Sequence, residues 1–437
     1  MLNIQKRLSN SFYAILSMPA TAMGFALCVQ ISALSWILST KYNLAIDEIG
    51  LIWASGPLAG LVMQLLIGLI SDKAWFWGGR RRPFILIGGV IAALMLLCLP
   101  NLDVIQKLFG ARSLIPVALC VATTLDLAIN LGFNPTRSLI TDVTPDGKAR
   151  TRGYTWMQTI SGTLGVLAYF IGAELGNYTL IYAGVFIVLA FSIIPVFFIE
   201  EPKILQSNNL NADVNALDIQ ATTQKAEVNE LVKIYLANAF SWIGVQTMFV
   251  FMFAYAAQIL FNTTDTSVLS EGNKNNIGKM IGYSFLILNA VGAFLPATVL
   301  EPLARKFGRI KVQSGCLFIM SVGYLLIVLF GTNATTLYLC MAIAGVGWAA
   351  IVSLPFAIMS EKVNKSRMGL FMGIFNMSIV IPQLIVSLII AQFVNDAADK
   401  KIIFEISAVS LFLSAVLWMW VKEKKTDYTA ATKISHH

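Results

Sequence analysis

Twelve long apolar stretches constrain the fold of this chain more than any other feature of its sequence. Each runs for about 20 residues, the length that an α-helix needs to cross about 30 Å of hydrocarbon. They lie at roughly residues 14–38, 50–71, 83–101, 113–140, 154–173, 179–199, 231–261, 278–303, 310–330, 335–360, 367–394 and 401–423. A composition of 57% hydrophobic and 12% charged residues fits no ordinary soluble domain. We therefore predict an all-α membrane protein with twelve transmembrane helices.

The basic residues are unevenly distributed over this topology. Most of them, including clusters at 80–82 and 305–311, fall between helices on the side that holds the N-terminus. The positive-inside rule places that side, and both termini, in the cytoplasm. It explains the net charge of +8 without a nucleic-acid partner. We expect a multi-pass protein of the plasma membrane, in a bacterium the inner membrane.

The sequence also predicts two similar halves. Residues 200–230 are polar and hold no aromatic residue, which is typical of a linker between an N-terminal half, 1–199, and a C-terminal half, 231–437. In each half an acid ends the second helix and a glycine and basic residues open the third, at 72–82 and again at 301–311. This repeat predicts two parallel six-helix pseudo-repeats that enclose a site near the middle of the membrane.

Charged residues at the predicted cytoplasmic ends are candidates for a gate. Asp72 could accept hydrogen bonds from arginines and from a helix N-terminus when the two halves close on that side. Alternatively, the arginines serve only to hold their loop in the cytoplasm. The candidate gating residues are Asp72, Arg80, Arg81, Arg82, Asp142 and Arg152.

The stretch TLDLAINLGFNPTR, residues 124–137, brings charge into a predicted helix. At about 100° per residue, Asp126, Asn130 and Arg137 share one face. Arg137 is about 16 Å along the axis from Asp126, too far for a salt bridge. A charge in the membrane costs on the order of 3 kcal/mol, so each must face a cavity or a partner on another helix. Arg137 could bind a substrate or, near the cytoplasm, Asp142.

Several motifs resemble those of the plant sucrose/proton symporters and their bacterial and animal glycoside-transporting relatives, within the major facilitator superfamily. The matching segments are GPLAGLVMQ at 56–64, SDK at 71–73, GGRRRPFI at 78–85, LDLAIN at 125–130 and GIFNMSIVIPQ at 373–383. The resemblance implies the major facilitator fold and proton-coupled import of a glucoside, such as sucrose or maltose, by alternating access. It also implies that Asp126 is the proton-coupling residue, with the proton as the coupling ion and no cofactor.

A sugar is an uncharged polyol with apolar ring faces, so its site needs amides, carboxylates and aromatic platforms. Amides within helices can equally form hydrogen bonds between helices, and both interpretations stay open for each. The candidate substrate-binding residues are Gln30, Gln64, Asn130, Arg137, Trp156, Asn376 and Gln383. Further amides and aromatic residues at similar depth are Trp36, Trp53, Tyr169, Asn238, Trp242, Gln246, Phe249, Asn289 and Trp348.

The same sequence is compatible with functions other than sugar import. The same scaffold could export an amphipathic small molecule with proton coupling, or sense a nutrient without transporting it. An enzyme is not expected, because no metal or nucleophile constellation appears and the five cysteines lie inside predicted helices without metal-type spacing. We expect no metal, and a chain that works as a monomer with a sugar, a proton and the lipid bilayer as partners.

Overall fold

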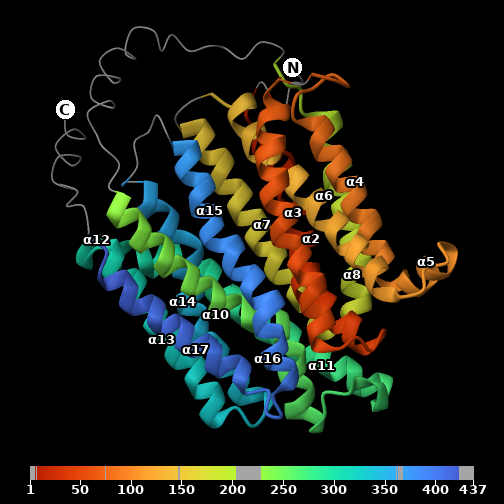
Figure 1. The fold of residues 1–437 in the computed structure, drawn as a ribbon. Coiled ribbons are helices and arrows are strands. Elements are labelled where there is room, and N and C mark those ends of the chain that lie inside the picture. Colours follow the sequence, from red (N-terminus) through yellow and green to blue (C-terminus); the bar gives the residue numbers. More distant parts are fainter. Residues whose placement is uncertain are drawn as a thin grey trace.

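The N-terminal half of the computed structural model is a bundle of six long helices (Figure 1). The structure describes residues 5, 7–73, 75–145, 148–202, 228–360, 362 and 368–422. The six helices are α2 (Asn10–Thr40), α3 (Ile46–Lys73), α4 (Arg82–Cys98), α6 (Leu114–Val143), α7 (Lys148–Glu174) and α8 (Asn177–Phe198). The short helices η1 (Leu99–Asn101) and α5 (Leu102–Leu108) follow α4, and α5 extends away from the bundle.

The C-terminal half forms a second bundle. Its long helices are α10 (Val228–Phe261), α11 (Glu271–Leu295), α13 (Arg309–Phe330), α14 (Ala334–Ser360), α15 (Met368–Ile385) and α17 (Ile402–Met419). Shorter elements are η2 (Thr266–Val268), η3 (Pro296–Leu300), α12 (Glu301–Phe307), η5 (Val386–Ile390) and α16 (Ala391–Asp396). Within the described part of the chain, every predicted apolar range overlaps a helix, and ten helices are long and apolar enough to cross a membrane.

Capping residues set where several helices begin. The Ser9, Ser113 and Ser270 side chains accept hydrogen bonds from backbone N–H groups at the starts of α2, α6 and α11. Helix α11 begins at Glu271, seven residues before the predicted start at 278. The apolar run marks only the part of the helix that is embedded in hydrocarbon. The helical hydrogen bonds continue through the polar segment before residue 278, as far as the Ser270 cap. The prediction of this start was therefore too late.

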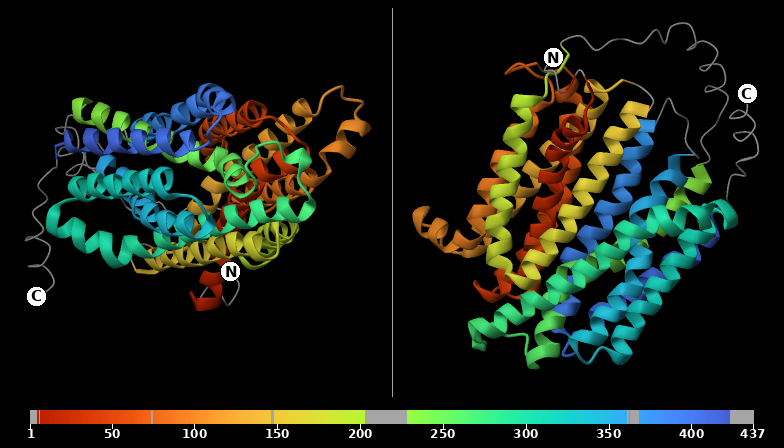
Figure 2. Two further views of the ribbon diagram at one scale, coloured as in Figure 1. Left: turned by 90° about the horizontal axis from the view of Figure 1, so that it is seen from below. Right: turned by 180° about the vertical axis from the view of Figure 1, so that it is seen from behind.

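The two ends of the N-terminal bundle are named here by the helices that begin or finish there. Helices α2, α4 and α7 start at one end, which holds Arg81, Arg82 and Arg152, and we name it the basic end. The other, the opposite end, is where α2 finishes and where α3, α8 and α11 begin. The views in Figures 1 and 2 show the helices of each half grouped together.

The two halves are tightly joined toward the opposite end. The Ser35 hydroxyl donates to the Val250 carbonyl at 2.9 Å, and Trp36 Nε1 donates to the Lys274 carbonyl at 2.8 Å. Helix α11 also comes into backbone contact with α7, because a Cβ on Gly282 would lie 2.8 Å from the backbone nitrogen of Ala173. A glycine is therefore required at this crossing.

Candidate functional site

A cavity of about 340 Å³ lies between the two halves. This volume is within the range of about 300–1,000 Å³ that is usual for small-molecule sites. Helices α2, α3, α6 and α7 line it from the N-terminal half, and α10, α11, α14 and α15 from the C-terminal half. Its lining includes Cys28, Gln30, Trp53, Gly56, Asp126, Asn130, Tyr169, Trp242, Gln246, Phe249, Asn289, Trp348, Asn376 and Gln383.

Asp126 is the acid of this cavity. Gln30 Nε2 on α2 donates to both carboxylate oxygens, at 3.1 Å and 3.0 Å. Helix α3 leaves room for the carboxylate with Gly56, where a Cβ would come within 2.7 Å of Asp126 Oδ2. Among the described residues no Lys or Arg forms an ion pair with Asp126. A neutral amide, rather than a fixed cation, therefore holds this acid, so a proton can join or leave it without breaking a salt bridge.

Asn130 lies one turn along α6 from Asp126 on the same wall. Its Nδ2 donates to the Asp126 backbone carbonyl at 2.9 Å. Its amide packs against Gly60 of α3, where a Cβ would approach Nδ2 to 3.4 Å. Gly56 and Gly60 are four residues apart and so share one face of α3. This pair of glycines lets α3 lie close to the polar face of α6.

The wall contributed by the C-terminal half combines amides with aromatic rings. Trp348 Nε1 donates to Asn289 Oδ1 at 3.1 Å, and Gln383 Nε2 donates to Gln246 Oε1 at 3.3 Å. Trp348 meets Trp242 and Phe249 edge to face, with ring centroids 6.3 Å and 5.3 Å apart. These rings form a continuous apolar surface whose polar edges are the indole and amide groups.

The aromatic surface continues into the N-terminal half. Phe285 of α11 meets Phe249 at 5.3 Å and Tyr169 of α7 at 5.9 Å between ring centroids. The Tyr169 hydroxyl lies near the Cys28 thiol and the Asn289 amide. Aromatic rings from both halves therefore pack together at this cavity, and its charged lining residue, Asp126, comes from the N-terminal half.

The structure brings several of the predicted substrate-binding residues to this cavity. Gln30, Asn130, Asn376 and Gln383 all line it, together with Asp126. Cys28 also lines it, although the sequence predicts for the five cysteines only that they lie inside helices without metal-type spacing. A lone thiol in an apolar helix carries no sequence signal that separates a cavity wall from a packed core.

Other predicted residues lie elsewhere. Arg137 is exposed, with its guanidinium 5.9 Å from the Phe133 ring centroid, and does not line the cavity in this conformation. Trp156 is half-buried and packs against an apolar cluster near the start of α2. Asn238 donates to the Ser378 hydroxyl at 2.9 Å inside the C-terminal half. The Gln64 and Asp72 side chains are outside the described residues, so their predicted roles stay predictions.

The predicted gating arginines are held within the N-terminal half. Arg81 Nε lies 3.1 Å from Asp142 Oδ2, with only 8% and 11% of the two side chains exposed. Arg82 Nη1 donates to the Val196 and Ile199 carbonyls of α8 and its end. Arg152 bonds to the Asn10 amide. These contacts of the three arginines lie within the N-terminal half, and the predicted contact of these charges across the two halves stays a prediction.

Glu201 organises this charged cluster and was not singled out from the sequence. Its carboxylate accepts from the backbone N–H groups of Arg80 and Arg81 at 2.8 Å each, and from that of Arg82 at 2.7 Å. Arg82 Nε lies 3.7 Å away. An acid placed at the start of α4 in this way binds its free N–H groups and complements the helix dipole. The only sequence signal was its place directly after the sixth apolar run.

Comparisons with known proteins give the family context. The chain matches the family model described as Major Facilitator Superfamily over residues 15–387 and 280–434. It is 28% identical to the sucrose transport protein SUC4 of Arabidopsis thaliana over 421 residues, covering 81% of this chain and 79% of the relative. It is 27% identical to the sucrose transport protein SUT2 of Oryza sativa subsp. indica over 425 residues, covering 82% of each.

Two solved structures share the fold at low sequence identity. The inward-open xylose transporter XylE from E. coli matches with a TM-score of 0.67 at 14% identity, over 97% of this chain and 99% of that one. The nucleoside transporter NupG matches with a TM-score of 0.67 at 13% identity, over 95% and 100%. At such identities the likeness concerns the fold.

Proposed function

Because this chain belongs to the Major Facilitator Superfamily, we propose that it is a sugar transporter that imports a glucoside together with a proton. The observation that carries the proposal is the cavity between the halves, where Asp126 and its amide partner face a wall of amides and indoles. The two relatives named above as sucrose transport proteins support a disaccharide such as sucrose or maltose as the substrate.

The cavity wall has the chemistry that a sugar requires. The rings of Trp242, Phe249 and Trp348 offer an apolar surface for the C–H face of a pyranose. The amides of Asn376 and Gln383 offer donors and acceptors for hydroxyl groups. A neutral polyol can exchange its water for these groups without bringing charge into the membrane, which suits repeated binding and release.

Asp126 is proposed as the proton carrier. Its Gln30 partner presents N–H groups to the ionised carboxylate, while Gln30 Oε1 is buried and has no hydrogen-bond partner among the described residues. Rotation of that amide would present the oxygen to the protonated acid. The same neighbour can thus serve both protonation states, so proton binding and release do not require a separate counter-ion.

The conformation fits one stage of alternating access. Contacts toward the opposite end close the cavity on that side. We propose that the basic end faces the cytoplasm, in the plasma membrane, as the distribution of basic residues predicts. The structure then corresponds to an inward-facing state, and import proceeds as the halves rock about the central site.

Transport assays in proteoliposomes test the substrate class. Proteoliposomes that contain the purified protein and are loaded with unlabelled sugar should take up labelled sucrose or maltose by exchange. Competing glucosides should block this uptake. Labelled xylose and uridine serve as controls from the substrate classes of the structural relatives. Absence of exchange for both disaccharides, together with proton-driven export of an amphipathic compound from the same proteoliposomes, would favour the alternative that the aromatic wall also permits, export of an amphipathic compound.

A further inference from the structure

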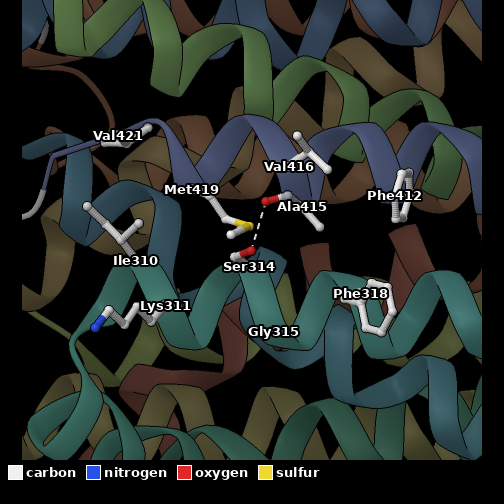
Figure 3. Close-up of a pocket in the computed structure, with 10 residues that line it drawn as sticks. All are labelled: Ile310, Lys311, Ser314, Gly315, Phe318, Phe412, Ala415, Val416, Met419 and Val421. Carbon is white, nitrogen blue, oxygen red and sulfur yellow. Dashed lines mark hydrogen bonds between the residues drawn. The ribbon is translucent and has the colours of Figure 1, made fainter.

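A second cavity of about 600 Å³ lies on the C-terminal half, between α13 and α17 (Figure 3). It shares no lining residue with the central cavity. Apolar side chains form most of its wall, including those of Phe318, Phe412, Val416 and Met419. Phe318 is 49% exposed and Met419 71% exposed, so this groove opens on the outer face of the bundle. In a membrane protein, that face is in contact with lipid.

The floor of the groove is apolar although it contains a serine. The Ser314 hydroxyl donates to the Ala415 backbone carbonyl at 2.8 Å, which satisfies both groups and ties α13 to α17 (Figure 3). Next to it, a Cβ on Gly315 would meet no heavy atom within 4 Å. The groove therefore has open space directly above the helix backbone, with no free hydroxyl to favour a polar occupant.

One end of the groove is basic. Lys311 lines it at the basic end, is exposed, and forms no ion pair among the described residues. Lys422 follows the lining residue Val421 and is also exposed. From Lys311 to Phe318 the groove runs seven residues along α13, about 10 Å at 1.5 Å per residue. A matching ligand has a negative head and a hydrocarbon tail.

We propose that this groove binds an anionic glycerophospholipid, with its phosphate at Lys311 and one acyl chain along Gly315, Phe318 and Phe412. Charge complementarity selects the anionic lipid, because the described lining offers the exposed Lys311 at its mouth, with Lys422 nearby, and apolar surface beyond it. Each basic residue near the surface of an anionic membrane contributes about 1 kcal/mol, a factor of about five in affinity. The proposal is independent of the sugar and the proton.

Native mass spectrometry of the full-length protein in detergent tests this site. The protein is titrated with phosphatidylglycerol and, separately, with phosphatidylcholine carrying the same acyl chains. The wild-type protein should bind its first phosphatidylglycerol molecule more tightly than its first phosphatidylcholine molecule. Lys311→Ala should weaken that binding about five-fold without changing phosphatidylcholine binding, and Lys311→Arg should retain it. Gly315→Leu should weaken both lipids, because its side chain fills the space for the tail.

A matched control uses another exposed lysine. Lys107 of α5 lies at the opposite end, and Lys107→Ala should leave the first binding step unchanged. Equal affinity of wild type for the two lipids would overturn the proposal. So would a Lys311→Ala protein that keeps its preference for phosphatidylglycerol, or a Gly315→Leu protein with unchanged lipid binding, since head and tail are probed independently.

Discussion

At the scale of single residues, the site depends on how closely α3 approaches Asp126. Gly56→Ala would place a Cβ within 2.7 Å of Asp126 Oδ2, so the carboxylate must leave the position in which it accepts from Gln30. We expect initial uptake of labelled sugar in proteoliposomes to fall at least about ten-fold, which corresponds to a loss of about 1.4 kcal/mol.

Gly24→Ala provides the control for this change. Gly24 also lies within a helix of the N-terminal half, α2, and a Cβ there would meet nothing within 4 Å. Both variants gain the same methyl group and the same helix propensity. Equal uptake by the two variants would mean that the position of the Asp126 carboxylate does not limit transport.

The sequence predicted the polar face of α6 but not the niche that receives it. Helical spacing places Asp126 and Asn130 together, and both line the cavity. Their partners Gln30 and Gly56 come from α2 and α3, far away in the chain, and spacing within one helix cannot pair them. Arg137 shares the face yet lies outside the cavity, because a helix face extends farther than the site.

At the scale of elements, Glu201 stabilises the start of α4. Its carboxylate accepts from three consecutive backbone N–H groups and is almost fully buried, with 1% of the side chain exposed. We expect Glu201→Ala to lower the free energy of unfolding by about 2 kcal/mol, since buried donors lose a charged acceptor. A thermal-shift measurement in detergent should show a decrease of several degrees.

Glu174→Ala is the matched control, because Glu174 makes one longer contact, 3.7 Å to Lys279, and is 35% exposed. Its melting temperature should stay near that of wild type. Equal melting temperatures for the Glu201 and Glu174 variants would contradict the capping role of Glu201.

Hydrophobicity predicts the long helices better than their interruptions. Every predicted apolar range corresponds to a helix in the described part of the chain, because each must satisfy its backbone hydrogen bonds internally. The π-helices Pro296–Leu300 and Val386–Ile390 fall inside predicted ranges and were not foreseen. A change from one helical hydrogen-bond pattern to another leaves composition unchanged, so an apolar run does not mark it.

At the scale of the whole molecule, close backbone packing keeps the opposite end closed. Gly282→Ala would bring a Cβ to 2.8 Å from the Ala173 backbone nitrogen, and backbone cannot move aside as a flexible side chain can. We expect this variant to favour conformers that are open at that end. Spin labels at Leu175 and Val268, both exposed near this junction, should show an increased population of long distances.

Gly162→Ala is its control, since it adds a methyl group on α7 where nothing lies within 4 Å. The distance distribution of this variant should match that of wild type. Identical distributions for both variants would show that the Gly282 contact does not set the balance between conformers.

Accumulation of sugar by the Asp126→Asn protein, measured beside exchange, tests the central claim of proton coupling most directly. In proteoliposomes with an imposed pH gradient, wild type should concentrate labelled sugar. Asparagine keeps the shape of the side chain but cannot carry a proton. We therefore predict that Asp126→Asn loses accumulation while keeping part of the exchange of labelled for unlabelled sugar. Accumulation by this variant at the wild-type level under the same pH gradient would contradict the account.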